Sequence, residues 1–444
     1  MQIILLSGGS GKRLWPLSND ARSKQFLKLL PAPCGGLESM VQRIARQIKE
    51  SEVEASLTVA TSISQLDSIM NQLGKSVDVV TEPERRDTFP AIALSASYLY
   101  KEKKCSRDEV VVVMPSDSYV ESGYFETIAK MATAVENSTA DIVLMGIEPT
   151  EPSTKFGYVV PNNKGTEVMT VDRFTEKPTE DIAKELLKQN AFWNGGVFAF
   201  RLGYIVDIVE KYIQADTFSE VRSRYIEFPK ISFDYEVVEK ASSIALVSYS
   251  GDWSDLGTWN SLTEKIANEN IGNVLSDENT TNTHIVNETN LPIVCLGAED
   301  MIIAASPDGI LVSKKEASVN LKSYADKLTA RPMYEERRWG TYKIMGLEHF
   351  EDGHNALTKM LHIHAGCSIS YQYHTQRDEI WTFVGGNGLM VLDGEIIEVS
   401  RGYVAHIKAG QRHALKAITD LHVIEVQSGT NFVEQDIIRL DWQW

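Results

Sequence analysis

The chain begins with a short apolar run, residues 3–6, that opens directly into the segment Ser7-Gly8-Gly9-Ser10-Gly11-Lys12-Arg13-Leu14. This pattern constrains the fold strongly, because a glycine loop after a buried strand is typical of phosphate-binding α/β domains. Glycines let backbone amides approach an anion, and Lys12 and Arg13 add fixed positive charge against a triphosphate. The pattern predicts a nucleotide ligand, with a plain turn as the alternative.

The spacing of this loop is not that of the common nucleotide motifs. A P-loop needs Gly-Lys-Ser/Thr after four intervening residues, and a dinucleotide site needs an acidic residue about 20 positions further on. Instead, a second basic side chain follows in Ser23-Lys24-Gln25-Phe26-Leu27. Residues 6–27 resemble the signature of the sugar-1-phosphate nucleotidylyltransferases, and most closely that of the mannose-1-phosphate guanylyltransferases.

Composition narrows the class of protein further. A formal net charge of -17 argues against a nucleic-acid or anionic-membrane binder, because both reward basic surfaces. The four cysteines are scattered without metal-ligand spacing, which favours reduced thiols in the cytosol. The sequence starts directly in a core strand and has no apolar run of about 18 residues. We therefore expect a soluble, cytoplasmic protein.

The first part of the chain alternates short apolar runs with amphipathic stretches. The predicted strands are residues 57–60, 77–80, 110–114 and 142–147, and the predicted helices are residues 37–49, 90–101 and 124–137. Continuous apolarity in the strands indicates burial on both sheet faces. We predict a Rossmann-like α/β nucleotidyltransferase domain over residues 1–265, with a mixed, mostly parallel sheet.

The pattern changes after residue 265. A segment rich in Asn, Thr and Asp leads into short β-like pieces at residues 293–296, 301–304 and 309–312 and a helical stretch at residues 317–328. These features predict a small β-rich linker domain over residues 266–330. Alternating β-patterns and glycine turns then predict an all-β barrel over residues 331–444.

Two aspartates stand at positions suited to a metal. Asp117 follows the predicted strand at residues 110–114, and Asp255 lies in a tight glycine-containing turn. Two carboxylates, phosphate oxygens and waters suit Mg²⁺, whereas a turn or a helix cap is the alternative for either residue alone. Both match the metal-binding aspartates of the guanylyltransferase family, so the resemblance implies a Mg²⁺ site.

The resemblance also implies the substrate-binding residues. The nucleotide-binding residues would be Leu6, Gly8, Gly9, Gly11, Lys12, Arg13, Glu82, Arg86 and Thr88. The sugar-phosphate-binding residues would be Gly157, Glu176, Lys177 and Asn194. A carboxylate at Glu82 or Glu84 can accept the two adjacent N–H groups of guanine, and backbone carbonyls are the alternative. The family commonly has Asn where Asp87 stands and Ala where Phe89 stands.

The implied reaction transfers GMP from GTP to α-D-mannose 1-phosphate and gives GDP-mannose and pyrophosphate. The implied catalytic residues are Arg13, Lys24, Asp117 and Asp255. The alternatives are a nucleotidyltransferase for another sugar 1-phosphate, such as a manno-heptose, and a binding protein that senses nucleotide sugars. Analogy predicts a homodimer or higher homo-oligomer.

The last domain offers a second candidate metal site. Gln372 and His374 share a strand face, Glu379 follows, and His413 lies in a later turn. This pattern looks like a cupin barrel, specifically the phosphomannose isomerase domain fused to some guanylyltransferases. It implies Zn²⁺ or another divalent metal.

The chain departs from that isomerase pattern at two places. It has a poorer histidine run after His374, and Ala414 stands where the fused isomerases have an arginine. Arg377 or Arg412 could replace that positive charge. An active isomerase, a silent metal-binding barrel and a metal-free structural barrel remain open.

Overall fold

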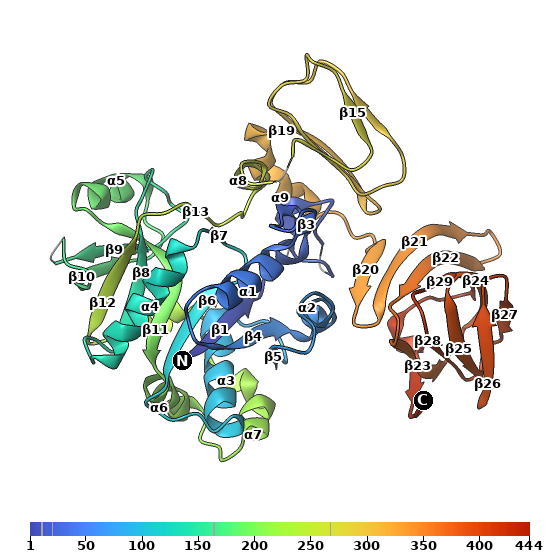
Figure 1. Ribbon diagram of the computed structural model, residues 1–444, viewed down its shortest axis with the longest axis horizontal. Coiled ribbons are helices and arrows are strands. Elements are labelled where there is room, and N and C mark those ends of the chain that lie inside the picture. Colours follow the sequence, from blue (N-terminus) through green and yellow to red (C-terminus); the bar gives the residue numbers. More distant parts are fainter. Residues whose placement is uncertain (10–11, 20, 163–164, 267) are drawn as a thin grey trace. The chain divides into compact units, whose positions relative to one another are not determined.

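The computed structural model describes residues 1–9, 12–19, 21–162, 165–266 and 268–444. It divides the chain into two compact units, which Figure 1 traces in sequence colours. The first comprises Met1–Ser10, Ser23–Leu66 and Gln72–Ala267, and the second comprises Gly11–Arg22, Asp67–Asn71 and Asn268–Trp444. Within the described ranges, no helix is long and apolar enough to span a membrane.

The first unit contains one nine-stranded sheet flanked by helices. In spatial order the strands are β5 (Asp78–Glu82), β4 (Ser56–Ser62), β1 (Gln2–Ser7), β6 (Val110–Pro115), β11 (Phe192–Arg201), β8 (Ile142–Ile147), β12 (Ile244–Tyr249), β10 (Met169–Thr175) and β9 (Tyr158–Pro161). The helices of this part of the chain are α1 (Met40–Glu50), α2 (Leu66–Leu73), α3 (Thr88–Ser97), α4 (Gly123–Glu136), α5 (Glu180–Lys188), α6 (Leu202–Tyr212), α7 (Phe218–Ser223) and α8 (Trp259–Thr263). The predicted α/β class and mixed sheet are confirmed.

The sheet is mixed as predicted, but parallel strand pairings do not predominate in it. Among the described residues, four strand pairings are parallel and five are antiparallel. The parallel ones join β5, β4, β1 and β6 in one half, and β8 with β12 in the other. Apolar runs report burial on both faces and carry no information about strand direction, so the sequence could not show the reversal at β11.

Alternation along the strands explains how both faces are covered. Ile4, Val111 and Leu144 belong to a core cluster that also contains several buried side chains of α3 and α6. Their neighbours Leu5 and Val112 are equally buried but lie outside that cluster. Successive side chains of a strand point to opposite faces, so the sheet has two buried faces.

The start of α1 differs slightly from the prediction of a helix over residues 37–49. Leu37 and Glu38 form the short strand β3 (Leu37–Glu38), which pairs with β2 (Leu30–Pro31). Ser39 then caps the helix: its side chain accepts the backbone N–H of Gln42, and the Gln42 side chain accepts the backbone N–H of Ser39. This capping box fixes the helix start at Met40.

The second unit contains the predicted small β-rich segment. Its strands are β14 (Asn270–Ile271), β15 (Val274–Ser276), β16 (His284–Asn287), β17 (Ile293–Cys295), β18 (Met301–Ser306) and β19 (Gly309–Lys314). β14, β16 and β18 pair in parallel, as do β15 and β17. The predicted helix at residues 317–328 is shorter, with a 3₁₀ turn at Glu316–Asn320 followed by α9 (Leu321–Ala325).

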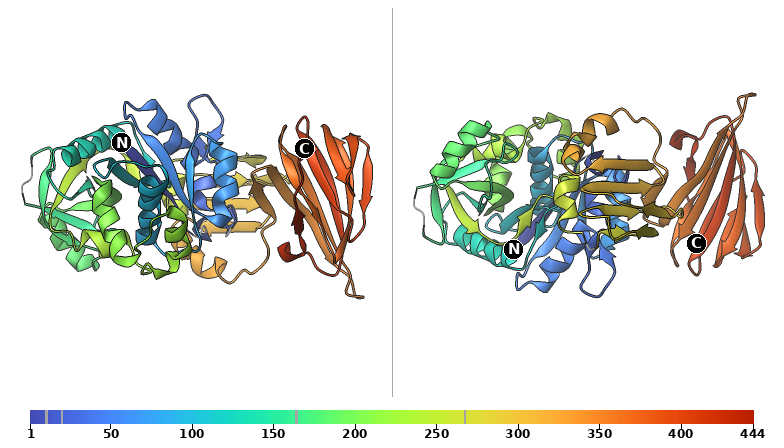
Figure 2. Two further views of the ribbon diagram at one scale, coloured as in Figure 1. Left: turned by 90° about the horizontal axis from the view of Figure 1, so that it is seen from below. Right: turned by 90° about the horizontal axis from the view of Figure 1, so that it is seen from above.

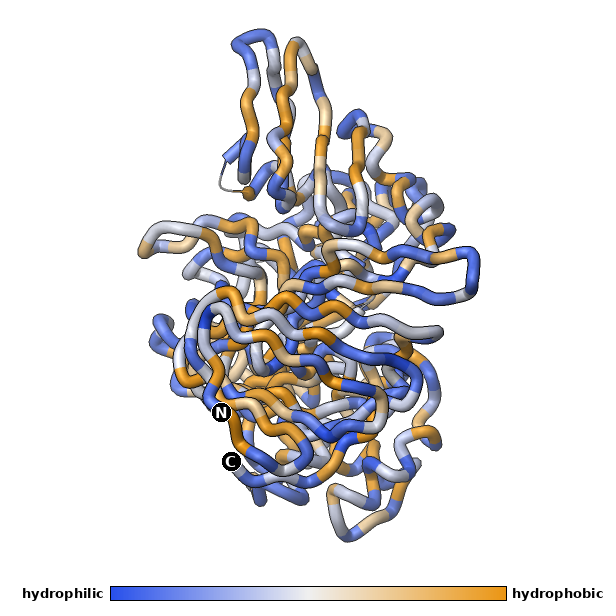
Figure 3. The backbone as a smooth tube through the Cα atoms, turned by 90° about the vertical axis from the view of Figure 1, so that its right-hand side faces the viewer, coloured by the Kyte–Doolittle hydropathy of each residue, from blue (hydrophilic) through white to orange (hydrophobic). Residues whose placement is uncertain are grey.

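The C-terminal part of this unit is an antiparallel barrel of two sheets. One contains β20 (Tyr334–Arg337), β21 (Gly340–His349), β22 (Asn355–Ile363), β29 (Leu421–Gly429), β24 (Arg377–Gly385) and β27 (Val404–Ile407). The other contains β26 (Glu395–Ser400), β25 (Asn387–Leu392), β28 (His413–Ala417), β23 (Ser368–Tyr373) and β30 (Ile438–Leu440). Figure 2 shows these strands as arrows in the orange to red part of the chain, and Figure 3 colours the backbone by hydropathy. The predicted cupin-like barrel is confirmed.

Candidate active site

Three of the predicted catalytic residues meet at one edge of the nine-stranded sheet. Asp117 follows β6, and Asp255 follows the short strand β13 (Trp253–Ser254), which pairs with β7 (Tyr119–Val120). The Lys24 Nζ lies 2.9 Å from Asp117 Oδ2 and donates to the backbone carbonyl of Asp255 at 2.7 Å. The fold therefore joins two acidic loops far apart in sequence through one ammonium group.

The glycine loop follows β1 directly. Gly9 has a φ of 112°, a conformation that favours glycine, and its carbonyl accepts from Ser23 Oγ at 3.1 Å and Gln65 Nε2 at 3.2 Å. A Cβ on Gly8 or Gly9 would have no heavy atom of the described residues within 4 Å, so these residues leave space beside this backbone. Leu6, at the end of β1, is half-buried.

The remaining residues of the predicted phosphate-binding loop are Gly11, Lys12 and Arg13. Gly11 lies outside the described residues. Lys12 and Arg13 form a 3₁₀ turn, Lys12–Leu14, in the segment that clusters with the second unit. Their roles at the phosphates remain predictions.

The predicted base-binding residues make specific contacts of their own. Glu82 ends β5, is 7% exposed, and accepts a 2.6 Å hydrogen bond from the Tyr225 hydroxyl at Oε2. Burial raises the pKa of Glu82, and the bond from Tyr225 offsets this only in part. Glu84 is exposed and paired with Arg86. Glu82 thus has one oxygen already engaged, and its role toward guanine remains a prediction.

Arg86 and Thr88 connect this segment to a later loop. Arg86 donates to the Phe228 carbonyl at 3.1 Å, and the Thr88 hydroxyl accepts the Phe233 backbone N–H at 2.8 Å. Sequence reasoning missed this loop and Tyr225. An aromatic residue gives no sequence signal of its partner when the two are far apart along the chain.

The predicted sugar-phosphate residues gather around a second cluster. Asn194 donates its backbone N–H to the Gly157 carbonyl at 2.8 Å, and Glu176 Oε1 lies 2.7 Å from Lys177 Nζ. A Cβ on Gly157 would meet the Glu176 carboxylate, so a larger residue here would have to displace the Glu176 side chain. The structure thus brings Gly157, Glu176, Lys177 and Asn194 together.

Asp234 completes this cluster and was not predicted from the sequence. Its Oδ1 accepts from Asn194 Nδ2 at 2.6 Å. Burial and the neighbouring Glu176 charge raise the pKa of Asp234 to about 6. An isolated Asp in a helical pattern carries no signal of such a partner.

Several buried polar atoms beside this cluster lack partners. Among the described residues, no hydrogen bond reaches Glu176 Oε2, Trp193 Nε1 or Trp253 Nε1. Both indoles pack against Phe156, with ring centroids 4.9 and 5.2 Å from it. An unpaired buried polar group costs about 1–3 kcal/mol, so these atoms suit a polar ligand such as a sugar.

The shifted pKa of Asp234 predicts a pH-dependent stability. The raised pKa means that the folded state binds this proton more tightly, so stability is lost as pH rises from about 4 to about 6. We expect Asp234→Asn to be more stable than the wild type by up to about 3 kcal/mol at about pH 7.5, and by only about 1 kcal/mol at about pH 4.5. Urea unfolding at both pH values measures the gap. The exposed Asp181→Asn is the control, and a gap independent of pH contradicts the assignment.

The barrel brings together three of the four predicted cupin ligands. His374, Glu379 and His413 are buried, and one ligand atom of each lies within 4.8 Å of the others. Glu379 Oε1 lies 3.1 Å from His374 Nε2, and its Oε2 lies 3.6 Å from His413 Nε2. Gln372 pairs with His413 across β23 and β28, while its side chain accepts from Ser370 at 2.9 Å.

The ring orientations suit metal ligation. His413 Nδ1 lies 3.0 Å from the Gln411 carbonyl and His374 Nδ1 lies 3.3 Å from the Asp436 carbonyl, so both Nε2 atoms are directed toward Glu379. Burial lowers the pKa of His413, which favours the neutral form that binds metals. His413 Nε2 is buried and makes no hydrogen bond to the described residues. This donor set fits a divalent ion.

Basic side chains lie beside this candidate metal site. Arg377 Nε donates to Glu379 Oε1 at 3.1 Å, whereas Arg412 is exposed. A cavity of about 450 Å³ reaches Glu379. Its basic lining residues are Arg331, Arg337, Arg338, Lys359, Arg377 and Arg439. Of the two arginines considered as substitutes at Ala414, the structure places Arg377 at the site.

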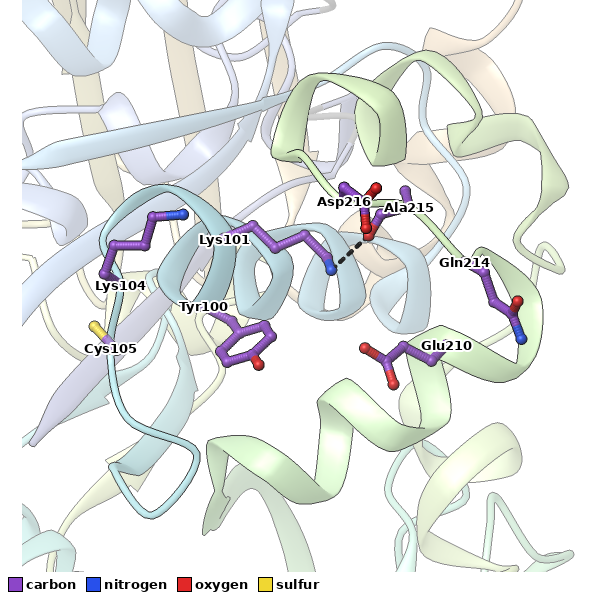
Figure 4. A pocket seen from close by; sticks show the side chains of 8 residues that line it. All are labelled: Tyr100, Lys101, Lys104, Cys105, Glu210, Gln214, Ala215 and Asp216. Atoms are coloured by element: carbon purple, nitrogen blue, oxygen red, sulfur yellow. Dashed lines mark hydrogen bonds between the residues drawn. The ribbon is translucent and has the colours of Figure 1, made fainter.

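A separate pocket of about 600 Å³ lies in the first unit, between the π-helical turn Tyr98–Glu102 and α6. Figure 4 shows the side chains that line it, including the 2.6 Å bond from Lys101 to the Ala215 carbonyl. Lysines and carboxylates both line it, and none of the predicted site residues does. It therefore stands apart from the clusters described above.

Comparison with known proteins agrees with this fold. A nucleotidyl transferase family model matches residues 2–271, and a model of the mannose-6-phosphate isomerase C-terminal region matches residues 326–442. The chain belongs to the nucleotidyl transferase family. It is therefore a nucleotidyltransferase with an N-terminal α/β domain.

Full-length relatives share both regions. The chain is 29% identical to the mannose-1-phosphate guanylyltransferase of Escherichia coli, over 99% of this chain and 98% of that protein. It is 28% identical to the alginate biosynthesis protein AlgA of Pseudomonas aeruginosa, over 99% and 96%. A crystal structure from Thermus thermophilus, described as a mannose-1-phosphate geranyltransferase, matches with a TM-score of 0.60 at 26% identity, over 74% of this chain and 99% of that one.

Proposed function

We propose that this chain transfers GMP from GTP to α-D-mannose 1-phosphate, giving GDP-mannose, a precursor of polysaccharides, and pyrophosphate. The similarity to mannose-1-phosphate guanylyltransferases along the whole chain carries this proposal. The meeting of Lys24, Asp117 and Asp255 at the sheet edge supports it. Both substrates are cytoplasmic metabolites, which supports a cytoplasmic location.

In this reaction an oxygen of the sugar phosphate attacks the α-phosphorus of GTP. The bond from that phosphorus to the oxygen bridging the β-phosphate breaks, and pyrophosphate leaves with the electron pair. The protein needs no covalent nucleophile, so it acts by alignment and by neutralising charge. Lys24 supplies positive charge beside the reacting phosphates. We assign Arg13 to the departing pyrophosphate.

Asp117 and Asp255 are the residues proposed to hold Mg²⁺. Carboxylate oxygens are the donors that Mg²⁺ prefers, and the ammonium of Lys24 shows that this edge already accommodates a cation. Bound Mg²⁺ would neutralise charge on the triphosphate. Asp255 Oδ1 accepts the Gly257 backbone N–H at 3.1 Å, which fixes the orientation of its carboxylate.

The sugar phosphate is proposed to lie at the cluster of Glu176, Lys177 and Asn194. The unpaired Glu176 Oε2 can accept a sugar hydroxyl, and the indole N–H groups of Trp193 and Trp253 can donate to others. Lys177 is exposed and can contact the phosphate. Another sugar 1-phosphate, such as a manno-heptose, is the alternative substrate. Pyrophosphate release measured over a matrix of nucleoside triphosphates and sugar 1-phosphates distinguishes them.

We propose mannose-6-phosphate isomerase activity as a second function of the barrel. The observation that favours it is the basic cavity at Glu379, because an aldose–ketose phosphate needs cations near its phosphate. His374, Glu379 and His413, with Gln372 beside them, would hold Zn²⁺ or another divalent metal that polarises the carbonyl. A coupled assay from mannose 6-phosphate to fructose 6-phosphate tests it; an inactive, metal-free protein leaves the barrel a structural role.

We also propose three domains, residues 1–265, 266–330 and 331–444. The two family matches support the outer domains.

We propose further that the chain forms a homodimer or higher homo-oligomer. The middle segment exposes several large apolar side chains, which supports self-association. They are Leu275, Leu291, Val294, Leu296, Ile310 and Val312. Light scattering should give a mass above that of one chain, and Leu296→Asp should lower it; a monomer contradicts the proposal.

A further inference from the structure

A second histidine cluster lies at one end of the barrel, where β22 ends and β29 begins. Three of the nine histidines of the chain meet there. His362 and His422 face each other across the two strands, with stacked rings 4.5 Å apart and an interplanar angle of 3°. His364 is the first residue after β22, and its ring lies edge-on to the ring of His362 with the centroids 5.0 Å apart.

This cluster is distinct from the buried site around Glu379. His362 stands between Leu361 and Ile363, which are 3% and 0% exposed and belong to the barrel core. Neighbouring residues of a strand point to opposite faces, so His362 points away from the core. Its side chain is 33% exposed, so solvent and ions can reach it.

A carboxylate completes the arrangement. Asp420 precedes β29, and its Oδ1 accepts the Ala365 backbone N–H at 2.9 Å. The other oxygen, Oδ2, lies 3.8 Å from His362 Nε2. One ligand atom each of His362, His364 and Asp420 lies within 4.8 Å of the others. Zinc bonds of about 2.0–2.2 Å place tetrahedral ligand atoms about 3.4 Å apart, a difference that small rotations of exposed side chains cover.

We propose that His362, His364 and Asp420 bind a divalent transition-metal ion of the Zn²⁺ class on the outside of the barrel. Two imidazoles and a carboxylate are a donor set that such ions prefer, and three protein ligands leave a position open for water. The formal net charge of -17 favours cation binding further.

His422 is a positioning residue in this arrangement. Its ring is parallel to that of His362, so its in-plane lone pair is not directed at an ion that His362 binds. The stacking holds the His362 ring in place. Gly385 leaves room for the His422 ring, because a Cβ at position 385 would lie 3.3 Å from His422 Cδ2.

The protonation states of the ligands agree with this assignment. Burial and the neighbouring His422 and His364 lower the pKa of His362, which favours the neutral ring. The Ala365 N–H lowers the pKa of Asp420, which keeps the carboxylate charged. Neutral imidazole and ionised carboxylate are the forms that bind metals.

The test is a titration of the full-length chain, stripped of metal by a chelator, with Zn²⁺ and with Co²⁺. The variants are His362→Phe, His364→Gln and His422→Phe, with His406→Gln as a histidine control outside the cluster. We expect wild type to bind one equivalent more than His362→Phe and His364→Gln, or to bind that equivalent at least about tenfold more tightly. His422→Phe keeps a stacking ring and should retain the ion, as should His406→Gln. The visible Co²⁺ absorption of this site should follow the same pattern.

The buried ligands around Glu379 are present in every variant, so their contribution cancels in the comparison. Hydrogen exchange of β22 and β29 and the unfolding midpoint check that the barrel of each variant is folded, and Asp420→Asn replaces His362→Phe if that variant fails to fold. Equal metal content and affinity in wild type, His362→Phe and His364→Gln overturn the proposal. Loss of the ion in His422→Phe alone overturns the ligand assignment.

Discussion

An Asp117→Ala variant should lose at least about a hundredfold in the rate of GDP-mannose synthesis, which corresponds to about 3 kcal/mol of transition-state stabilisation. The reason is that Asp117 is one of two proposed Mg²⁺ ligands and also holds the Lys24 ammonium at 2.9 Å. Without the Asp117 carboxylate, the proposed Mg²⁺ and the Lys24 ammonium are both misplaced relative to the reacting phosphates. Pyrophosphate release with GTP and mannose 1-phosphate measures the loss.

Asp181→Ala is the matched control for this change. Asp181 is an exposed carboxylate in the first turn of α5, and none of the predicted site contacts includes it. It should keep the wild-type rate. Because Asp117 is itself partly exposed, its loss should leave the fold intact, which the unfolding midpoint checks. An Asp117→Ala enzyme within about threefold of wild type contradicts the proposed metal site.

A Trp381→Ala variant should destabilise the barrel by about 3–5 kcal/mol, the usual cost of removing a large buried aromatic side chain. Trp381 is 1% exposed and packs edge-on against His413 at 5.3 Å. Its Nε1 also donates to Glu379 Oε2 at 3.1 Å, so the truncation leaves a buried carboxylate with one partner fewer. Hydrogen exchange of β24 and β29, followed by mass spectrometry, measures this loss locally.

Trp381→Phe separates the two contributions. Phenylalanine keeps most of the buried volume but cannot donate to Glu379, so its cost should be smaller, about 1–2 kcal/mol. GDP-mannose synthesis should persist in both variants, because Lys24, Asp117 and Asp255 belong to the first unit. Unchanged exchange in Trp381→Ala, or equal losses in the two variants, contradicts this account of the barrel core.

The sequence predicted the elements of the fold better than their arrangement. The runs of Val and Ile in β6 and β8 identified buried strands, because apolar continuity follows from burial on both faces. The direction of β11 relative to them was not predictable, since it depends on which edge of the sheet the chain returns to. In the small β segment the sequence indicated β17, β18 and β19 but neither the three strands before them nor the parallel pairing.

The candidate site shows the same division. Asp117 and Asp255 could be proposed because motifs place functional residues at fixed positions along the chain. Asp234, Tyr225 and the unpaired indoles of Trp193 and Trp253 could not, because their roles arise from tertiary contacts with Asn194, Glu82 and Phe156. The outer His362 cluster depends in the same way on the register between β22 and β29.

The most direct test of the central claim uses GTP labelled at the α-phosphate, with mannose 1-phosphate, Mg²⁺ and the purified full-length chain. If the chain is a guanylyltransferase, the label should appear in GDP-mannose, in amounts matching the pyrophosphate released, and Asp117→Ala should form almost none. Product that is absent from the wild-type reaction, or equal in wild type and Asp117→Ala, would falsify the claim.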